Sequence, residues 1–254
     1  MLKVCIKYVV LKVDIMNLVV DKGNTRIKFA LFDEFKIVCK GRSYTELLTM
    51  SESSCYDTII SVSGILEAEF RQLLEKNAAL YVEANPLMKL PIGIKYSNRE
   101  TLGFDRIADC VGAYELYRDN NLLVIDIGTA ITYNYIDVNG NFIGGNISPG
   151  LDIRFSSLHE HTAKLPLLKS TLIFNKIGNS TETAIVSGVI NGMIFEVLGY
   201  IDEFIEQNNN SKVIITGGYN FFIKGKVKQN IIFNDDLGLI GLNKILEYHK
   251  KMVL

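Results

Sequence analysis

Apolar residues in this sequence occur either in short runs or at helical spacing, and the two kinds of segment alternate. Runs rich in Val, Ile and Phe between turn residues predict strands, whereas apolar positions three or four apart predict helices. The predicted strands are residues 17–21, 27–32, 39–42, 58–63, 80–82, 122–126, 131–137, 141–143 and 212–216. The predicted helices are residues 45–50, 65–77, 101–117, 151–159, 181–206 and 239–252.

The order of these elements is repeated along the chain. Three strands are followed by a helix, a strand and a helix in the first half, and the same order returns in the second half. Glycines and prolines predict loops at residues 86–98 and around residues 144–150. The sequence therefore predicts an α/β fold with two related lobes, residues 16–119 and residues 120–254.

Two turns carry the strongest chemical signal. Residues 21–25 (Asp-Lys-Gly-Asn-Thr) and residues 126–129 (Asp-Ile-Gly-Thr) each follow an apolar strand and lead into a returning strand. Their threonines align when one residue is gapped, which also aligns Asp33 with Asp137. Glycine lets backbone N–H groups approach a phosphate closely, and a carboxylate can hold a cation or its water shell. Two such tips facing each other would hold the phosphates of a nucleotide, as in the actin, hexokinase and Hsp70 superfamily.

Composition limits the classes of function. The chain has 254 residues, of which 48% are hydrophobic and 22% charged, so it can bury a substantial core. The net charge of -1 gives no argument for a nucleic-acid partner, and the local run of Lys224, Lys226 and Lys228 is interpreted as a solvated turn. The four cysteines are far apart, which is typical of reduced residues in a cytosolic protein. No run approaches 18 apolar residues, so no membrane span is expected.

The first fifteen residues need a separate interpretation. Their apolar runs are broken by Lys3, Lys7 and Lys12, and no small-residue cleavage site follows, so a signal peptide is not expected. Met16 stands directly before the first predicted strand. Residues 1–15 are therefore interpreted as an N-terminal extension upstream of a natural start at Met16, and whether they are native is left open.

Three further motifs each allow two interpretations. Residues 103–106 (Gly-Phe-Asp-Arg) begin a predicted helix, where an Asp is either a helix cap or a general base with an Arg beside it. Residues 216–218 (Thr-Gly-Gly) form either a turn beneath an adenine or an ordinary turn at the end of a strand. His159 and His161 have zinc-like spacing but no third ligand nearby, so an exposed or structural pair is expected.

These motifs occur in the order and at the spacing of one family. From Met16 to near its C-terminus, the sequence resembles the type III pantothenate kinases, also described as the Bvg accessory factor family. The matching segments are residues 21–28, 96–98, 102–106, 126–132, 144–150, 162–166, 178–181, 187–188 and 216–218. The resemblance implies a two-lobed fold like that of actin, hexokinase and Hsp70, which is ribonuclease H-like and built from duplicated βββαβα units.

The resemblance also implies a reaction and its residues. The reaction is the ATP-dependent phosphorylation of pantothenate to 4'-phosphopantothenate, the first step of coenzyme A biosynthesis, with Mg²⁺ and with K⁺ or NH₄⁺. Asp105 is implied to be the proton acceptor and Asp126 a ligand of the monovalent cation. The implied ATP-binding residues are Asp21, Lys22, Gly23, Asn24, Thr25, Arg26, Ile27, Lys28 and Thr129. The implied pantothenate-binding residues are Tyr96, Gly103, Phe104, Asp105, Arg106 and Thr181.

The sequence departs from the family pattern at three positions. Arg99 stands where Pro is usual, Phe104 where a small residue is common, and Asn134 where Asp is frequent. The first two lie near the substrate loop and therefore put its detailed shape in question.

Two rival functions remain open: a non-catalytic nucleotide-binding regulator, and another small-molecule kinase on the same fold. Retention of Asp21, Asp105 and Asp126 argues against the first, and the constellation of Tyr96 with residues 103–106 favours pantothenate over other acceptors. The family resemblance further implies a cytoplasmic homodimer, in which the second subunit can complete the pantothenate pocket, with no nucleic-acid or membrane partner.

Overall fold

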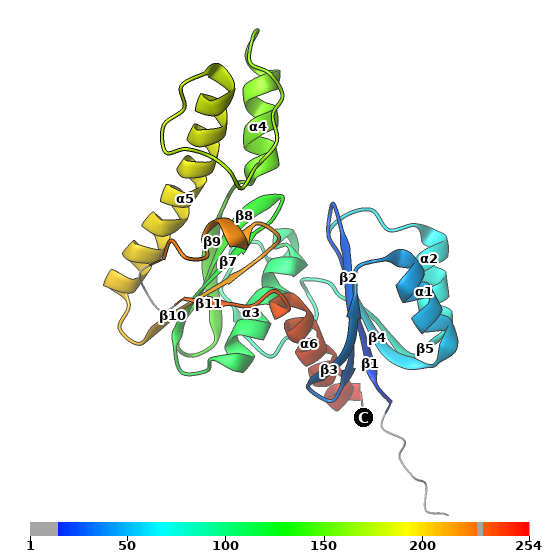
Figure 1. Cartoon of the computed structure of the whole chain (residues 1–254). Coiled ribbons are helices and arrows are strands. Elements are labelled where there is room, and N and C mark those ends of the chain that lie inside the picture. The colour runs from blue at the N-terminus through cyan, green and yellow to red at the C-terminus, as the bar shows by residue number, and fades with distance from the viewer. Residues whose placement is uncertain (1–14, 228–230, 254) are drawn as a thin grey trace, which may run out of the picture.

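The computed structural model describes residues 15–227 and 231–253, which form two β-sheets with helices between and outside them (Figure 1). The first sheet has the strand order β3-β2-β1-β4-β5. Its strands are β1 (Asn17–Lys22), β2 (Ile27–Asp33), β3 (Lys36–Gly41), β4 (Tyr56–Val62) and β5 (Ala78–Glu83). The helices α1 (Tyr44–Ser53) and α2 (Ala68–Lys76) cover its outer face (Figure 1).

The second sheet has the strand order β11-β10-β7-β8-β9-β6. Its strands are β6 (Gly93–Ile94), β7 (Asn121–Ile127), β8 (Ala130–Ile136), β9 (Asn141–Pro149), β10 (Ser211–Thr216) and β11 (Ile232–Phe233). The remaining helices are α3 (Phe104–Leu116), α4 (Leu151–Glu160), α5 (Thr181–Gln207) and α6 (Leu237–Val253), with short 3₁₀ turns η1 (Arg99–Thr101) and η2 (Asn220–Phe222).

The two sheets are built on one plan, which confirms the predicted duplication. In the first sheet β1 pairs antiparallel with β2 and parallel with β4, and in the second sheet β7 pairs antiparallel with β8 and parallel with β10. The order β3-β2-β1-β4-β5 therefore corresponds to β9-β8-β7-β10-β11, with β6 added at the edge beside β9. The fold is the predicted pair of mixed α/β lobes.

Three hydrophobic cores hold these layers together. The first sheet packs its outer face on α1 and α2, and the second packs its outer face on α4 and α5. The third core lies between the sheets, where α3 and α6 contact strands of both (Figure 1). Helix α6, which is more than 200 residues from β1 in the sequence, thus covers the inner face of the first sheet. The division of the chain at residues 119 and 120 remains a prediction.

The structure corrects two predicted loops. Residues 144–150 were expected to form a loop, but β9 continues to Pro149 and pairs antiparallel with β8 along its length. A Cβ at Gly145 would overlap the carbonyl oxygen of Tyr133, so this glycine permits close pairing rather than a turn. The expected loop 86–98 contains β6, which pairs with β9.

Helix α5 is an exception to the expectation that the sequence contains no membrane span. By length and composition alone, it is the one helix of the described residues that could cross a bilayer. Small and polar residues interrupt its apolar face, so it contains no long continuous apolar run. Of the 18 consecutive residues of α5 with the highest mean hydropathy, 44% are buried. Met193 and Val197, for example, pack against the outer face of the second sheet. A buried core helix has the same length and composition, so these two properties do not distinguish α5 from one.

Three regions lie outside the described residues: 1–14, 228–230 and 254. Most of the proposed N-terminal extension therefore falls in the first of these regions, as Lys228 of the basic run falls in the second. The described chain begins with Ile15 and Met16, and the carbonyl of Met16 accepts a hydrogen bond of 3.1 Å from the backbone of Asp57 in β4.

Candidate functional site

The two predicted hairpin tips meet each other in the structure. The Oγ1 atoms of Thr25, between β1 and β2, and Thr129, between β7 and β8, lie 3.2 Å apart. Each tip is closed by a hydrogen bond of 3.0 Å from a glycine N–H, from Gly23 in one case and Gly128 in the other. Residues 104 positions apart thus form one contact at the boundary between the lobes.

A small cavity of about 40 Å³ lies beneath these tips. It is lined by Asp21, Lys28, Asp105, Ala108, Asp109, Asp126, Thr216, Asp235, Gly238 and Leu239. Four of these, Asp21, Lys28, Asp105 and Asp126, were predicted from the sequence, and the structure brings them together from both lobes. Asp109 and Asp235 were missed. Asp109 lies four residues after Asp105, a spacing that places both on one helix face, whereas no sequence pattern pointed to Asp235.

The two sheets place their aspartates at equivalent positions. Asp21 is the penultimate residue of β1 and pairs with Lys28 of β2, and Asp126 is the penultimate residue of β7 and pairs with Thr216 of β10. Opposite charges facing each other across two strands stabilise the pair, so Lys28 is held next to Asp21. The duplicated topology therefore delivers one carboxylate from each lobe to the same cavity.

The remaining predicted ATP residues occupy the first tip and its approaches. The buried ammonium of Lys22 donates a hydrogen bond of 2.7 Å to the carbonyl of Gly23. Asn24 and Arg26 are exposed at the tip. Ile27 is buried in the outer core of the first sheet, so its backbone rather than its side chain is available to a ligand.

Burial and mutual repulsion dominate the electrostatics of the cavity. Burial raises the pKa of Asp21 to about 6, and the neighbouring carboxylates of Asp105 and Asp126 add to this while Lys28 opposes it. Burial likewise raises the pKa of Asp126 to about 6, with Lys28 lowering it and Asp105 raising it. The pKa of Asp109 is raised well above its ordinary range by burial and then by Asp126 and Asp105. The cavity therefore has more negative charge than Lys28 compensates.

Asp105 lies in the first turn of α3. Its Oδ1 accepts a hydrogen bond of 2.8 Å from the backbone of Arg106. A Cβ on Gly103, the residue preceding the helix, would lie 2.5 Å from the same oxygen. The absence of a side chain at Gly103 thus leaves room for the carboxylate. The N-cap residue of α3 is Gly103, with no side-chain capping hydrogen bond, so the cap interpretation of Asp105 is wrong. Asp105 stands in the first turn and lines the cavity, a position that is compatible with the base interpretation.

Arg106 is buried next to Asp105, with 5% of its surface exposed. Its Nε donates a hydrogen bond of 2.6 Å to Asn134, and its guanidinium lies over the rings of Tyr96 and Phe142 at 5.8 and 5.4 Å. Among the described residues, its Nη2 has no hydrogen-bond partner. A buried donor without an acceptor costs free energy, so this nitrogen is suited to a polar or anionic ligand group.

Two predicted substrate residues have less direct positions. The ring of Phe104 is 6% exposed and packs in the core between the sheets, which accounts for the large residue at this position. Thr181 is the exposed first residue of α5 and does not line the cavity. The structure therefore brings Tyr96, Gly103, Asp105 and Arg106 together but leaves Thr181 apart from them.

The turn after β10 packs against Asp126. Gly217 has φ +95, a conformation that side chains disfavour, and a Cβ there would overlap Asp126 Oδ1. A Cβ on Gly218 would lie 3.4 Å from a guanidinium nitrogen of Arg26, so the first tip reaches this turn across the boundary between the lobes.

Among residues 15–227 and 231–253, no group of three or more His, Cys, Asp or Glu could hold a metal ion.

Duplicated lobes whose Asp-bearing hairpin tips meet at a shared cavity define the fold class of actin and the sugar kinases. Solved structures support this class at the level of the fold. A putative Baf family transcriptional activator from Campylobacter jejuni matches 92% of this chain and 99% of its own, with 21% identity and a TM-score of 0.58. A putative N-acetylmannosamine kinase from Listeria monocytogenes matches 92% and 99%, with 13% identity and a TM-score of 0.53.

Sequence comparison narrows the class to a family. A family model described as type III pantothenate kinase matches residues 17–203. The type III pantothenate kinase of Porphyromonas gingivalis is 39% identical over 241 residues, which covers 92% of this chain and 98% of that relative. The chain belongs to the type III pantothenate kinase family.

Proposed function

We propose that this chain transfers the γ-phosphoryl group of ATP to the primary hydroxyl of pantothenate, which produces 4'-phosphopantothenate and begins coenzyme A synthesis. The observation that supports the proposal is the meeting of Asp21, Lys28, Asp105 and Asp126 around one cavity between the lobes. A nucleotide-binding regulator would not need a carboxylate in the position of Asp105. Family membership favours pantothenate over other acceptors.

In this proposal the two hairpin tips hold the phosphates of ATP. Residues 21–28 and Thr129 provide backbone N–H groups, two hydroxyls and Lys28, which approach from opposite lobes. Phosphoryl transfer depends mainly on positioning and on neutralising charge, because the protein forms no covalent intermediate. A contact made jointly by both lobes satisfies that need, since it aligns the phosphates with residues of both.

Asp105 accepts the proton of the attacking hydroxyl. Arg106 and Tyr96 form the wall beside it, and the unpaired Nη2 of Arg106 offers a donor to a polar group of pantothenate. Gly103 keeps space free at the carboxylate. Thr181 lies apart from this wall and stays a proposed contact of pantothenate. The proposed protein is a cytoplasmic homodimer, in which the second subunit completes the pantothenate pocket.

The charge of the cavity fits cations. Asp21 and Asp126 are partly buried carboxylates whose pKa values are raised chiefly by burial, with repulsion from Asp105 adding to the shift. Hard cations prefer oxygen ligands of this kind. Asp126 would hold K⁺ or NH₄⁺, and Asp21 would hold waters of the Mg²⁺ that accompanies ATP. When bound, these ions neutralise charge on the phosphates during transfer.

An ATP-consumption assay across acceptors tests the proposal. Pantothenate should be phosphorylated, whereas N-acetylmannosamine and glucose should leave ATP intact. Asp105→Asn keeps the shape of the side chain but removes its basicity, so turnover should fall about 10²-fold or more while ATP binding is retained. ATP consumption with a sugar rather than pantothenate, or normal turnover by Asp105→Asn, would contradict the proposal.

A further inference from the structure

The segment between β5 and α3 crosses from the first sheet to the second. After leaving β5, the chain forms β6 and pairs with β9 of the other lobe. The backbone N–H of Gly93 donates to the carbonyl of Gly140 at 3.0 Å, and that of Lys95 donates to the carbonyl of Phe142 at 2.9 Å. Tyr96 follows directly, so the position of this substrate residue depends on how β6 is held at an exposed sheet edge.

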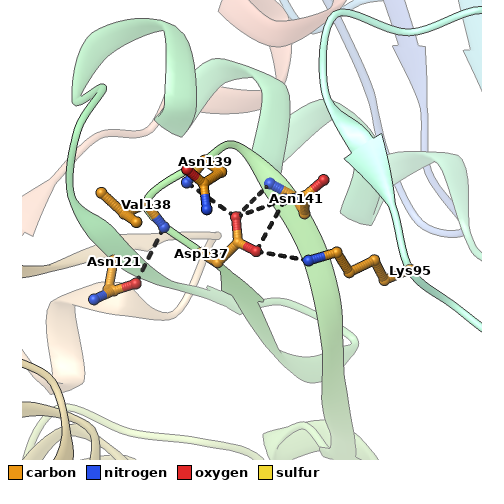
Figure 2. Close-up of polar contacts among 6 residues, drawn as sticks. All are labelled: Lys95, Asn121, Asp137, Val138, Asn139 and Asn141. Atoms are coloured by element: carbon orange, nitrogen blue, oxygen red, sulfur yellow. Dashed lines mark hydrogen bonds and ion pairs between the residues drawn. The ribbon is translucent and has the colours of Figure 1, made fainter.

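Asp137, in the turn between β8 and β9, is the centre of the contacts that hold β6 (Figure 2). Its Oδ1 accepts hydrogen bonds from the backbone N–H groups of Asn139 and Asn141, at 3.0 and 2.9 Å. Both of its oxygens accept from the side-chain amide of Asn141 at 2.9 Å, and Oδ2 pairs with the ammonium of Lys95 at 3.0 Å. Burial opposes ionisation here, but the donors from Asn141 and Lys95 lower the pKa of Asp137 below its ordinary value.

The neighbouring residues are shaped to this cluster. The side-chain oxygen of Asn141 lies where a Cβ of Gly93 would be, so a side chain on Gly93 would displace it. On the other side, Gly140 lies against the ring of Tyr114, which belongs to α3. The same turn therefore contacts β6 and the helix that carries Asp105 and Arg106.

These contacts converge on the wall of the substrate pocket. The ring of Tyr96 lies 5.8 Å from that of Phe142, the β9 residue whose carbonyl holds Lys95. The guanidinium of Arg106 lies over both rings. The Lys95 side chain is 58% exposed, and two backbone hydrogen bonds also hold this segment. Loss of the link between Asp137 and Lys95 would therefore loosen the segment just before Tyr96 rather than detach it, without touching Asp105 or the phosphate tips.

We propose that Asp137, through Lys95 and Asn141, is a positioning element that anchors β6 to the second lobe and thereby fixes Tyr96 against Arg106 for binding of the acceptor. This inference rests on the proposed function for the identity of that acceptor, pantothenate. Asp137 itself does not touch the reacting atoms. Its effect should therefore fall on acceptor binding and not on the ATP site.

The internal duplication provides a matched control. Asp33 ends β2 as Asp137 follows β8, and the two align in the sequence repeat. The first sheet has β3 at its edge and no strand corresponding to β6 among the described residues. Asp33→Asn therefore makes the same chemical change in the equivalent turn without releasing a substrate segment.

The test compares Asp137→Asn, Lys95→Met and Asp33→Asn in the full chain. Asn at position 137 keeps an acceptor for the turn but presents an N–H donor toward Lys95 and Asn141, so the anchor is broken selectively. We expect the KM for pantothenate to rise about tenfold in Asp137→Asn, with kcat and the KM for ATP within about twofold. Lys95→Met should raise the KM for pantothenate by a smaller factor, and Asp33→Asn should leave this KM unchanged.

Hydrogen exchange gives a readout that does not depend on the acceptor. The amides of residues 93–96 should exchange about tenfold faster in Asp137→Asn than in the unaltered protein, while those of residues 21–28 stay unchanged. Unchanged exchange at residues 93–96, or equal changes in kcat and both KM values, would overturn the inference. If the unaltered protein does not phosphorylate pantothenate, the proposed function fails, and exchange still decides whether Asp137 anchors β6.

Discussion

The carboxylates of Asp21 and Asp126 lie in one cavity together with the ammonium of Lys28. Their pKa values of about 6 lie above the ordinary value of 3.8, so the folded state binds protons more tightly than the unfolded state. Below pH 3.8 both states are protonated and the aspartates cost nothing. As the pH rises from about 3.8 to about 6, the unfolded state ionises first and stability is lost. Above about pH 6 the free energy of unfolding decreases no further through these two groups.

Asp126→Asn should therefore stabilise the protein without ligands, and more so at pH 8 than at pH 5. Asparagine removes the buried charge while keeping the size of the side chain. In Tris buffer lacking K⁺, NH₄⁺ and Mg²⁺, we expect its melting temperature at pH 8 to rise by about 4 °C or more. Thermal melting at both pH values measures this. A variant less stable than the unaltered protein at pH 8 would show that Asp126 is compensated by contacts within the fold.

The same residue carries a prediction about cations. Phosphotransferase activity should be slow in Tris or Na⁺ and restored by K⁺ or NH₄⁺, because in the proposed function Asp126 would supply a carboxylate to a monovalent cation. Asp126→Asn should abolish this activation. Initial rates at constant ionic strength measure the effect. Equal rates in all four salts would rule out a cation requirement.

For single residues of the candidate site, the sequence identifies those that lie in a recognisable turn or at the start of a helix. Asp21 and Asp126 were found because each begins a glycine-containing tip, and Asp105 because it begins a helix. Asp235 could not be found in this way. It reaches the cavity from the loop before α6, and only packing between the end of the chain and α3 places it there.

Among the elements, α3 and α6 approach each other most closely where glycines face the partner backbone. A Cβ on Gly241 of α6 would overlap the carbonyl oxygen of Ala108, and one on Gly112 of α3 would overlap that of Leu237. Because α3 carries Asp105 and α6 lines the cavity, this crossing also sets the depth of the site. Larger residues would separate the two helices.

Gly241→Ala should be destabilising for this reason. Overpacking costs typically 1–3 kcal/mol, so the melting temperature should fall by about 2–12 °C. Gly199→Ala is the matched control, since Gly199 is an exposed glycine of α5 and a Cβ there would meet no neighbouring atom within 4 Å. The control should be neutral or more stable by up to about 1 kcal/mol. Equal melting temperatures for the two variants would contradict the close crossing.

Strands and helices with strong periodicity were predictable, and their pairings were not. The long runs that became β7 and α5 have the expected type within one residue at each end. β6 has only two residues and exists because β9 offers an open edge. Of the two adjacent glycines that suggested a loop in β9, Gly145 is explained by close pairing with Tyr133, whereas Gly144 has φ +145 beside the irregularity of the β8–β9 register. Neither the pairing nor the irregularity is visible in local sequence.

For the molecule as a whole, residues 1–15 are predicted to be dispensable. The first sheet begins at Asn17, and Met16 already contacts β4. A shortened chain beginning at Met16 should keep its melting temperature within a few degrees and retain its kinase activity. A large loss of stability on shortening would contradict the prediction.

The position of α6 has a consequence for how the protein is made. Val19 and Ile59 of the first sheet pack in one core with Leu242 and Leu246 of the last helix, and Lys250 pairs with Asp57 at 2.8 Å. On a ribosome, β1 emerges about 215 residues before the start of its covering helix, which corresponds to roughly 11–43 s of synthesis at 5–20 residues per second. Until then a nascent chain exposes an apolar sheet face that chaperones recognise. A ribosome that stalls before α6 therefore releases an open sheet for proteolysis, and not a half-active enzyme.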